Sequence, residues 1–176
     1  MPRHVALLRA INVGGHTVEM KRLQKLFEML AFTDVETFIA SGNVIFTAAA
    51  GPARALESRI EAHLERSLGY SVATFLRTPP QLRSIAEHRA FAKPAPGSTL
   101  YIGFLAAKPV AAAVRQMEAL ATDIDEFRVH DRELYWRCRK TMGVSKVSGA
   151  KLEKALGLPM TLRQLSTVEK LAAKYG

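Results

Sequence analysis

Two short polar stretches contain residue types that could bind an anion. Asn12-Val13-Gly14-Gly15 follows a strand-like run, and its glycines could present backbone N–H groups to a phosphate. Ser41-Gly42-Asn43 is typical of a hairpin turn, because glycine and asparagine tolerate a positive φ. Neither stretch matches G-x-x-x-x-G-K-[ST] or G-x-G-x-x-G. Spacing alone therefore favours a loop that needs glycine for its backbone over a ligand loop, and both interpretations stay open.

Arginine at position 9 is the third candidate in this region. On a strand, Arg9 shares a face with Leu7 and Ile11. A buried arginine must be paired with an acid or bind an anion. The alternatives are a partner carboxylate within the chain or a strand end that reaches solvent.

Basic charge is concentrated at the C-terminal end. The formal net charge is +9, and residues 137–176 hold nine lysines and arginines against two glutamates, so 9 − 2 = +7 lies there. The remaining 136 residues carry 9 − 7 = +2. This bias predicts a polyanionic partner, and the alternative is a solvated basic surface.

The segment TLRQLSTVEKL, residues 161–171, has the pattern of a capped helix. Thr161 and Gln164 form a T-x-x-Q capping box at its start. Arg163, Thr167 and Lys170 then follow one another at helical spacing on a single stripe. A basic stripe at a helix N-terminus suits a phosphate, whereas a terminal helix with a solvated face is the alternative.

The sequence predicts no metal site and no cofactor. The histidines show no i, i+4 pair, and the only cysteine, Cys138, excludes an internal disulfide. Arg137 and Arg139 flank Cys138 and could lower its pKa, although plain packing is the alternative. A single cysteine, no signal peptide and no apolar run of membrane-spanning length predict a cytoplasmic protein without membrane contact.

Hydrophobic periodicity predicts a β-α-β-β-α-β order over residues 3–77. Its strands are expected within 4–11, 35–40, 44–48 and 71–77, and its helices within 20–32 and 53–68. A helix at 80–91 and a linker at 93–98 follow, and then the pattern restarts. Its second half comprises a strand at 99–106, a helix at 110–121, a hairpin of 125–129 with 133–138, and a short helix at 149–156.

The predicted fold is therefore α+β, with two ferredoxin-like subdomains packed together. The second copy is expected to lack its last strand and to gain a C-terminal helix. The predicted boundaries are 1–92, a linker at 93–98, and 99–176. Since the first two strands of such a unit run parallel, Asn12–Gly15 should lie beside Ser41–Asn43 at one sheet edge.

The chain resembles a bacterial family, domain of unknown function 1697. The matching segments are ALLRAINVGG, FTDVETFIASGNVIF, YIGFL, Ser145-Lys146 and TLRQLSTVEKL. The resemblance implies two α+β subdomains and no established activity. It favours function at the positions that match these motifs, which are Arg9, Asn12, Gly14, Gly15, Ser41, Gly42, Asn43, Arg163, Thr167 and Lys170.

Three hypotheses of function follow. The first is binding of nucleic acid or another polyanion by the basic C-terminal region. The second is an enzyme or sensor for a small anionic ligand at the Asn12–Gly15 and Ser41–Asn43 edge, and the third is an interaction module without a site. The charge bias places the first slightly ahead, and the residues name neither a reaction nor an oligomeric state.

Overall fold

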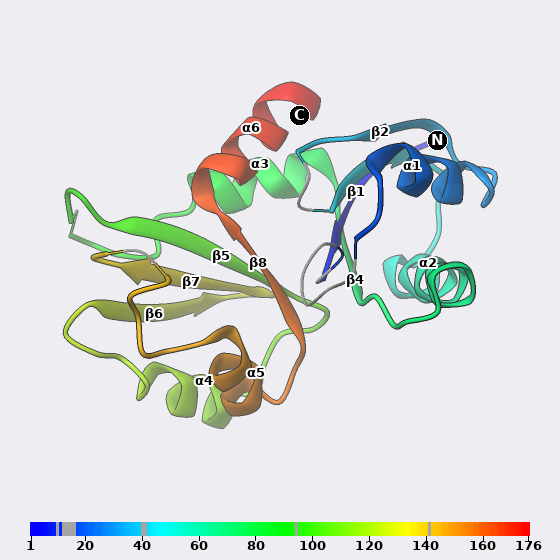
Figure 1. The fold of residues 1–176 in the computed structure, drawn as a ribbon. Coiled ribbons are helices and arrows are strands. Elements are labelled where there is room, and N and C mark those ends of the chain that lie inside the picture. Colours follow the sequence, from blue (N-terminus) through cyan, green and yellow to red (C-terminus); the bar gives the residue numbers. More distant parts are fainter. Residues whose placement is uncertain (10, 12–16, 40–41, 94, 141) are drawn as a thin grey trace. The chain divides into compact units, whose positions relative to one another are not determined.

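A computed structural model describes residues 1–176 apart from residues 10, 12–16, 40–41, 94 and 141 (Figure 1). The chain is mixed α+β, and its described residues form two four-stranded antiparallel sheets and six helices. They divide into two compact units, Met1–Leu82 with Tyr175–Gly176 and Arg83–Lys174. The predicted linker at 93–98 falls within the second unit.

The first unit has the predicted β-α-β-β-α-β order. Its elements are β1 (Arg3–Leu8), α1 (Met20–Glu28), β2 (Thr33–Thr37), β3 (Asn43–Thr47), α2 (Ala53–Leu68) and β4 (Thr74–Arg77). The strands are arranged β2-β3-β1-β4, so β1 is central as predicted. Side chains of β1 are buried on both faces: Ala6 and Leu8 belong to the core cluster of α1 and α2, while Val5 and Leu7 point the other way and are also fully buried.

The second unit repeats this element order after α3 (Pro79–Glu87). Its elements are β5 (Thr99–Leu105), α4 (Ala111–Glu118), β6 (Asp125–His130), β7 (Glu133–Cys138), α5 (Gly149–Leu156), β8 (Met160–Gln164) and α6 (Leu165–Tyr175). The strands are arranged β6-β7-β5-β8, and α4 and α5 lie on one face of this sheet (Figure 1). Ser148 caps α5, since its hydroxyl accepts from the Lys151 N–H.

The prediction that the second copy lacks its last strand is wrong. Residues 160–164 form β8, which pairs with β5 and places Thr161 opposite Phe104 and Arg163 opposite Ile102. The predicted capping box of Thr161 and Gln164 is wrong for the same reason. Met160 is buried in the core formed with α4 and α5, and the half-buried Leu162 packs against that core, so alternation along a strand places these two side chains on the same face.

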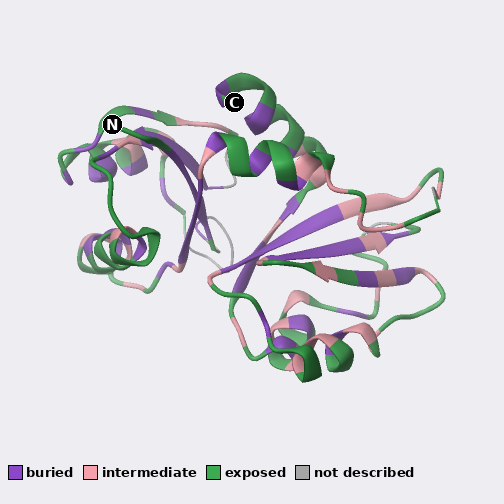
Figure 2. Cartoon of the chain, turned by 180° about the vertical axis from the view of Figure 1, so that it is seen from behind, coloured by how far each residue is buried: buried purple, intermediate pink, exposed green. Residues whose placement is uncertain are grey.

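Side chains of β6 and β7 alternate between two environments. Phe127, Trp136 and Cys138 enter the core formed with α4 and α5. Register then places Glu126 opposite Arg137 on the other face. Along β6 the residues change between buried, intermediate and exposed (Figure 2), whereas β7 is buried at every position except the half-buried Arg137. The pairing of Glu126 with Arg137 brings opposite charges together outside the core.

Candidate functional site

Two of the predicted residues meet the end of β1 in the first unit. The Leu8 N–H donates to the carbonyl of Gly42 at 2.9 Å, and Leu7 lies opposite Asn43. The expectation that the hairpin glycine reaches the end of the first strand is confirmed for these residues. Four further candidates, Asn12, Gly14, Gly15 and Ser41, lie outside the described part of the chain.

Gly42 and Asn43 have local structural roles. Gly42 has a φ of +79°, and a Cβ there would lie 2.6 Å from Cγ2 of Ile11. Asn43 is fully buried and donates its side-chain N–H to the Phe38 carbonyl at 2.9 Å, which closes the β2–β3 turn. Backbone conformation at Gly42 and the side-chain hydrogen bond of Asn43 therefore account for these residue types without a ligand.

Arg9 lies at a strand end that reaches solvent, which is one of the alternatives open from the sequence. The strand ends at Leu8, and Arg9 is exposed, with its backbone N–H donating to the Ala73 carbonyl. The interpretation of Arg9 as a buried cation on an apolar strand face is therefore wrong. Because its exposed guanidinium can be solvated, Arg9 needs no bound anion to compensate for the loss of water.

Arg163 does not share a helical stripe with Thr167 and Lys170. It belongs to β8 and is 7% exposed, and its guanidinium donates to the Thr161 hydroxyl at 2.7 Å and to the Leu162 carbonyl at 2.9 Å. Burial lowers its pKa to about 10. Thr167, half-buried, and Lys170, exposed, lie on α6.

The second unit contains a charged cavity of about 540 Å³ beside β6 and β7. We call it the basic cavity. Its charged and aromatic lining comprises Phe91, Lys93, Glu126, Arg128, Arg137 and Arg139. Four cationic side chains face one carboxylate, so the lining carries 4 − 1 = +3 in formal charge.

Arg137 forms the fixed part of the basic cavity. Its Nη2 lies 3.0 Å from both carboxylate oxygens of Glu126, and its Nη1 donates to the Lys93 carbonyl. The guanidinium also lies 4.4 Å from the centroid of the Phe91 ring. With 12% of its side chain exposed, Arg137 is held by the protein and neutralises Glu126.

Two exposed arginines complete the basic cavity. The side chain of Arg139 is 61% exposed and lies 3.7 Å from Glu126. Arg128 is exposed on β6, with its guanidinium 5.6 Å from the Phe91 centroid and its Nη1 donating to the Phe127 carbonyl at 2.7 Å. Planar guanidiniums that stay accessible beside a fixed framework are suited to contact with a phosphate group.

Residues 1–135 match the family described as "Protein of unknown function (DUF1697)". The chain belongs to this family. Its matched range ends before Arg137, Arg139 and the C-terminal segment, so two of the arginines that line the basic cavity lie outside the family match. No curated protein matches the chain.

The DUF1697 chain is also similar to a solved structure, that of the conserved bacterial protein SP0830 from Streptococcus pneumoniae. The TM-score is 0.74 with 18% sequence identity, over 99% of this chain and 98% of that one. Identity at this level shows a shared fold and says nothing of shared chemistry.

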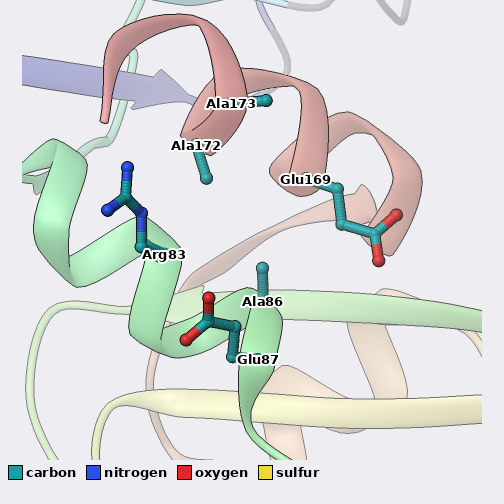
Figure 3. Close-up of a pocket in the computed structure, with 6 residues that line it drawn as sticks. All are labelled: Arg83, Ala86, Glu87, Glu169, Ala172 and Ala173. Atoms are coloured by element: carbon teal, nitrogen blue, oxygen red, sulfur yellow. The ribbon is translucent and has the colours of Figure 1, made fainter.

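A second cavity of the DUF1697 chain, of about 240 Å³, lies between α3 and α6. Figure 3 shows Arg83 and Glu87 on α3 and Glu169 on α6, with Ala86, Ala172 and Ala173 between them. Two carboxylates and one guanidinium give it no cationic character. Within the described residues, no group of three or more His, Cys, Asp or Glu side chains could hold a metal ion, and no helix could cross a membrane.

Cys138 is a packing residue of the core, and the arginines that flank it in the sequence do not lower the pKa of its thiol. Cys138 is fully buried in the core, and burial raises its pKa. The flanking Arg137 and Arg139 line the basic cavity on the opposite face. We expect the native thiol to react with a disulfide reagent at least about tenfold more slowly than in the urea-unfolded chain. Equal rates in the two states would contradict this burial.

Proposed function

We propose that this DUF1697 protein binds a polyanion, with single-stranded nucleic acid as the first candidate, through the basic cavity. The observation that supports it is the convergence of Arg128, Arg139 and Lys93 around a carboxylate that Arg137 already neutralises. Phosphate groups bind such cations with release of counterions. The +7 excess of residues 137–176 would add long-range attraction.

The central part of the sheet face that RNA-binding domains of similar topology use is a poor candidate here. On that face, Tyr135 of β7 is buried and donates its hydroxyl hydrogen to the Ile85 carbonyl of α3 at 3.0 Å. Ile102 and Phe104 of β5 are fully buried as well. Bases could not stack on these side chains without removal of α3, which favours the basic cavity at the sheet's edge.

We also infer that the two units are copies of one ferredoxin-like arrangement. Strand orders β2-β3-β1-β4 and β6-β7-β5-β8 are equivalent, and each unit has the same β-α-β-β-α-β sequence of elements. A cytoplasmic location is proposed with it, since one buried cysteine suits a reducing compartment.

Charge reversal at the two exposed arginines tests the binding proposal. In fluorescence anisotropy with labelled single-stranded RNA and DNA, we expect affinity to fall about tenfold or more between about 50 and about 200 mM salt. Arg128→Glu with Arg139→Glu should weaken binding by at least about tenfold at the lower salt concentration. Arg163 is unsuitable for such a test, because a buried glutamate there would unfold the protein.

The matched control is Lys21→Glu with Lys25→Glu, two exposed lysines on α1 that give the same change in net charge. This control should change affinity by about twofold or less if the basic cavity is the binding site. An equal loss in both double variants would reduce the interaction to net charge alone. Absence of binding at low salt would overturn the proposal.

A further inference from the structure

The basic cavity contains an aromatic ring that phosphate binding by itself does not require. Phe91 is half-buried, follows α3 in the chain, and contributes its ring to the cavity lining. Guanidiniums of Arg137 and Arg128 lie 4.4 and 5.6 Å from the ring centroid. A ring and two planar cations at one site offer flat surfaces for a planar ligand group.

The division of roles among the arginines limits where a phosphate can bind. Both Nη atoms of Arg137 already donate within the protein, to Glu126 and to the Lys93 carbonyl. The exposed guanidiniums of Arg128 and Arg139 are therefore the groups of the lining best placed to contact a phosphate. Since both oxygens of Glu126 accept from Arg137, its carboxylate repels a nearby anion less.

The size of the basic cavity exceeds the needs of a phosphate group. Its volume of about 540 Å³ lies within the range of about 300–1,000 Å³ that is usual for small-molecule sites. A phosphate held at its arginines would leave space beside Phe91. An apolar, planar group attached to the phosphate would fill that space.

We propose that the basic cavity binds a phosphorylated nucleoside unit, with its base stacked on Phe91 and its phosphate held by Arg128 and Arg139. The phosphate contact rests on the function proposed above, whereas the base contact goes beyond it. The same unit can come from a single-stranded nucleic acid or from a mononucleotide. Binding needs no covalent step, and the ring provides stacking that is tolerant of base identity.

The test separates the base from the phosphates. Wild-type protein is titrated with a single-stranded oligonucleotide of about 10 residues and with an abasic oligonucleotide of the same length, which keeps every phosphate. One stacked base should make the base-containing strand bind about tenfold more tightly. Phe91→Leu keeps an apolar side chain but removes the ring, so it should abolish this preference by weakening binding of the base-containing strand about tenfold more than binding of the abasic strand.

Phe38→Leu is the matched control, because Phe38 is another half-buried phenylalanine and lies in the first unit. It should retain the full preference for bases. A parallel arm measures thermal stabilisation by uridine and adenosine monophosphates and by inorganic tripolyphosphate. Stabilisation by the mononucleotides that depends on Phe91 would identify a free nucleotide as the source.

The outcomes distinguish the two proposals. Salt-sensitive binding of both strands with equal affinity, unaffected by Phe91→Leu, would overturn the base contact and leave polyanion binding in place. Phe91-dependent stabilisation by mononucleotides without binding of any oligonucleotide would support the base contact and overturn nucleic-acid binding. No response to any of these probes would overturn both.

Discussion

Gly42→Ala is expected to lower the free energy of unfolding of the first unit by about 2–5 kcal/mol. The left-handed conformation at φ +79° costs a residue with a Cβ about 1–2 kcal/mol. Overpacking adds about 1–3 kcal/mol, because the new Cβ would lie 2.6 Å from Ile11 Cγ2 and 3.2 Å from Leu8 Cβ. Ile11 is buried and β1 is the central strand, so neither neighbour can move away at low cost.

The measurement must report on the first unit. Trp136 is the chain's single tryptophan and lies in the second unit, so far-UV circular dichroism in urea is used with hydrogen exchange at the Leu8 amide. That amide donates to the Gly42 carbonyl and should lose protection first. Gly51→Ala is the matched control and should be nearly neutral, since a Cβ at position 51 would meet no atom within 4 Å and the φ there is not positive.

This result bears on the small-ligand hypothesis for the Asn12–Gly15 and Ser41–Asn43 edge. Backbone conformation and the close approach of Ile11 require glycine at position 42. The hydrogen bond to the Phe38 carbonyl explains asparagine at position 43. Loss of binding in variants of these two residues would therefore follow from unfolding. A native-like Gly42→Ala protein would show that the edge is more open than its geometry indicates.

Elements with a clear period or cap could be predicted from the sequence. The helix predicted at 53–68 matches α2, because a continuous apolar stripe ends at Gly69, which adopts φ +82°. The short helix predicted at 149–156 matches α5, which Ser148 begins and Gly157 ends. In both cases local chemistry at the helix ends agrees with the packing.

The C-terminal strand could not be predicted from local pattern. Thr161 and Gln164 have the spacing of a capping box, and that preference is real for an isolated segment. Pairing with β5, far away in sequence, supplies the backbone hydrogen bonds of residues 160–164 and overrides it. Because of this pairing, Arg163 lies on a buried strand and not on the exposed helix that the sequence pattern predicts.

The basic cavity could be predicted only in part. The hairpin prediction, with strands at 125–129 and 133–138 around His130-Asp131-Arg132, brings Glu126 and Arg137 onto neighbouring strands. The register that sets them opposite each other was not predicted, because β6 extends to His130 and shortens the turn to two residues. Alternation then puts both on the face opposite Trp136. Phe91 carries no such signal, because it reaches the cavity from the segment after α3 through tertiary packing alone.

Asp125 connects this binding surface to the core. It is fully buried and precedes Glu126 on β6. Its carboxylate accepts from Trp136 Nε1 at 2.8 Å and from the hydroxyls of Thr122 and Ser145 at 2.7 Å each. These bonds tie β6 to β7 and to the chain that follows β7, and so fix the strands whose opposite faces present the arginines.

Asp125→Ala is expected to lower the free energy of unfolding of the second unit by about 3–5 kcal/mol. The buried Trp136 N–H would lose its acceptor, at a cost of about 1–3 kcal/mol, and the hydrogen bonds from the Thr122 and Ser145 hydroxyls to a charged carboxylate would also be lost. Asp125→Asn keeps the shape and one acceptor oxygen and should cost about 1–3 kcal/mol. Trp136 fluorescence in urea reports the change directly, since its indole N–H is one of the donors. Asp123→Asn, an exposed neighbour, is the control and should be close to neutral.

The contribution of Asp125 to the free energy of unfolding should depend on pH in a definite direction. Burial alone would raise the pKa of Asp125, but the hydrogen bonds it accepts, those of Ser145 and Thr122 first, outweigh burial and hold the pKa below its usual value. The unfolded chain therefore takes up the proton first as pH falls, so the stabilisation is complete above the unfolded pKa of about 4 and is lost as pH falls through the folded pKa. In the Asp125→Asn variant, the free energy of unfolding should therefore fall less steeply as the pH is lowered through this range. If the wild-type protein and the Asp125→Asn variant lost stability in parallel below about pH 4, the carboxylate would not carry the charge assigned to it.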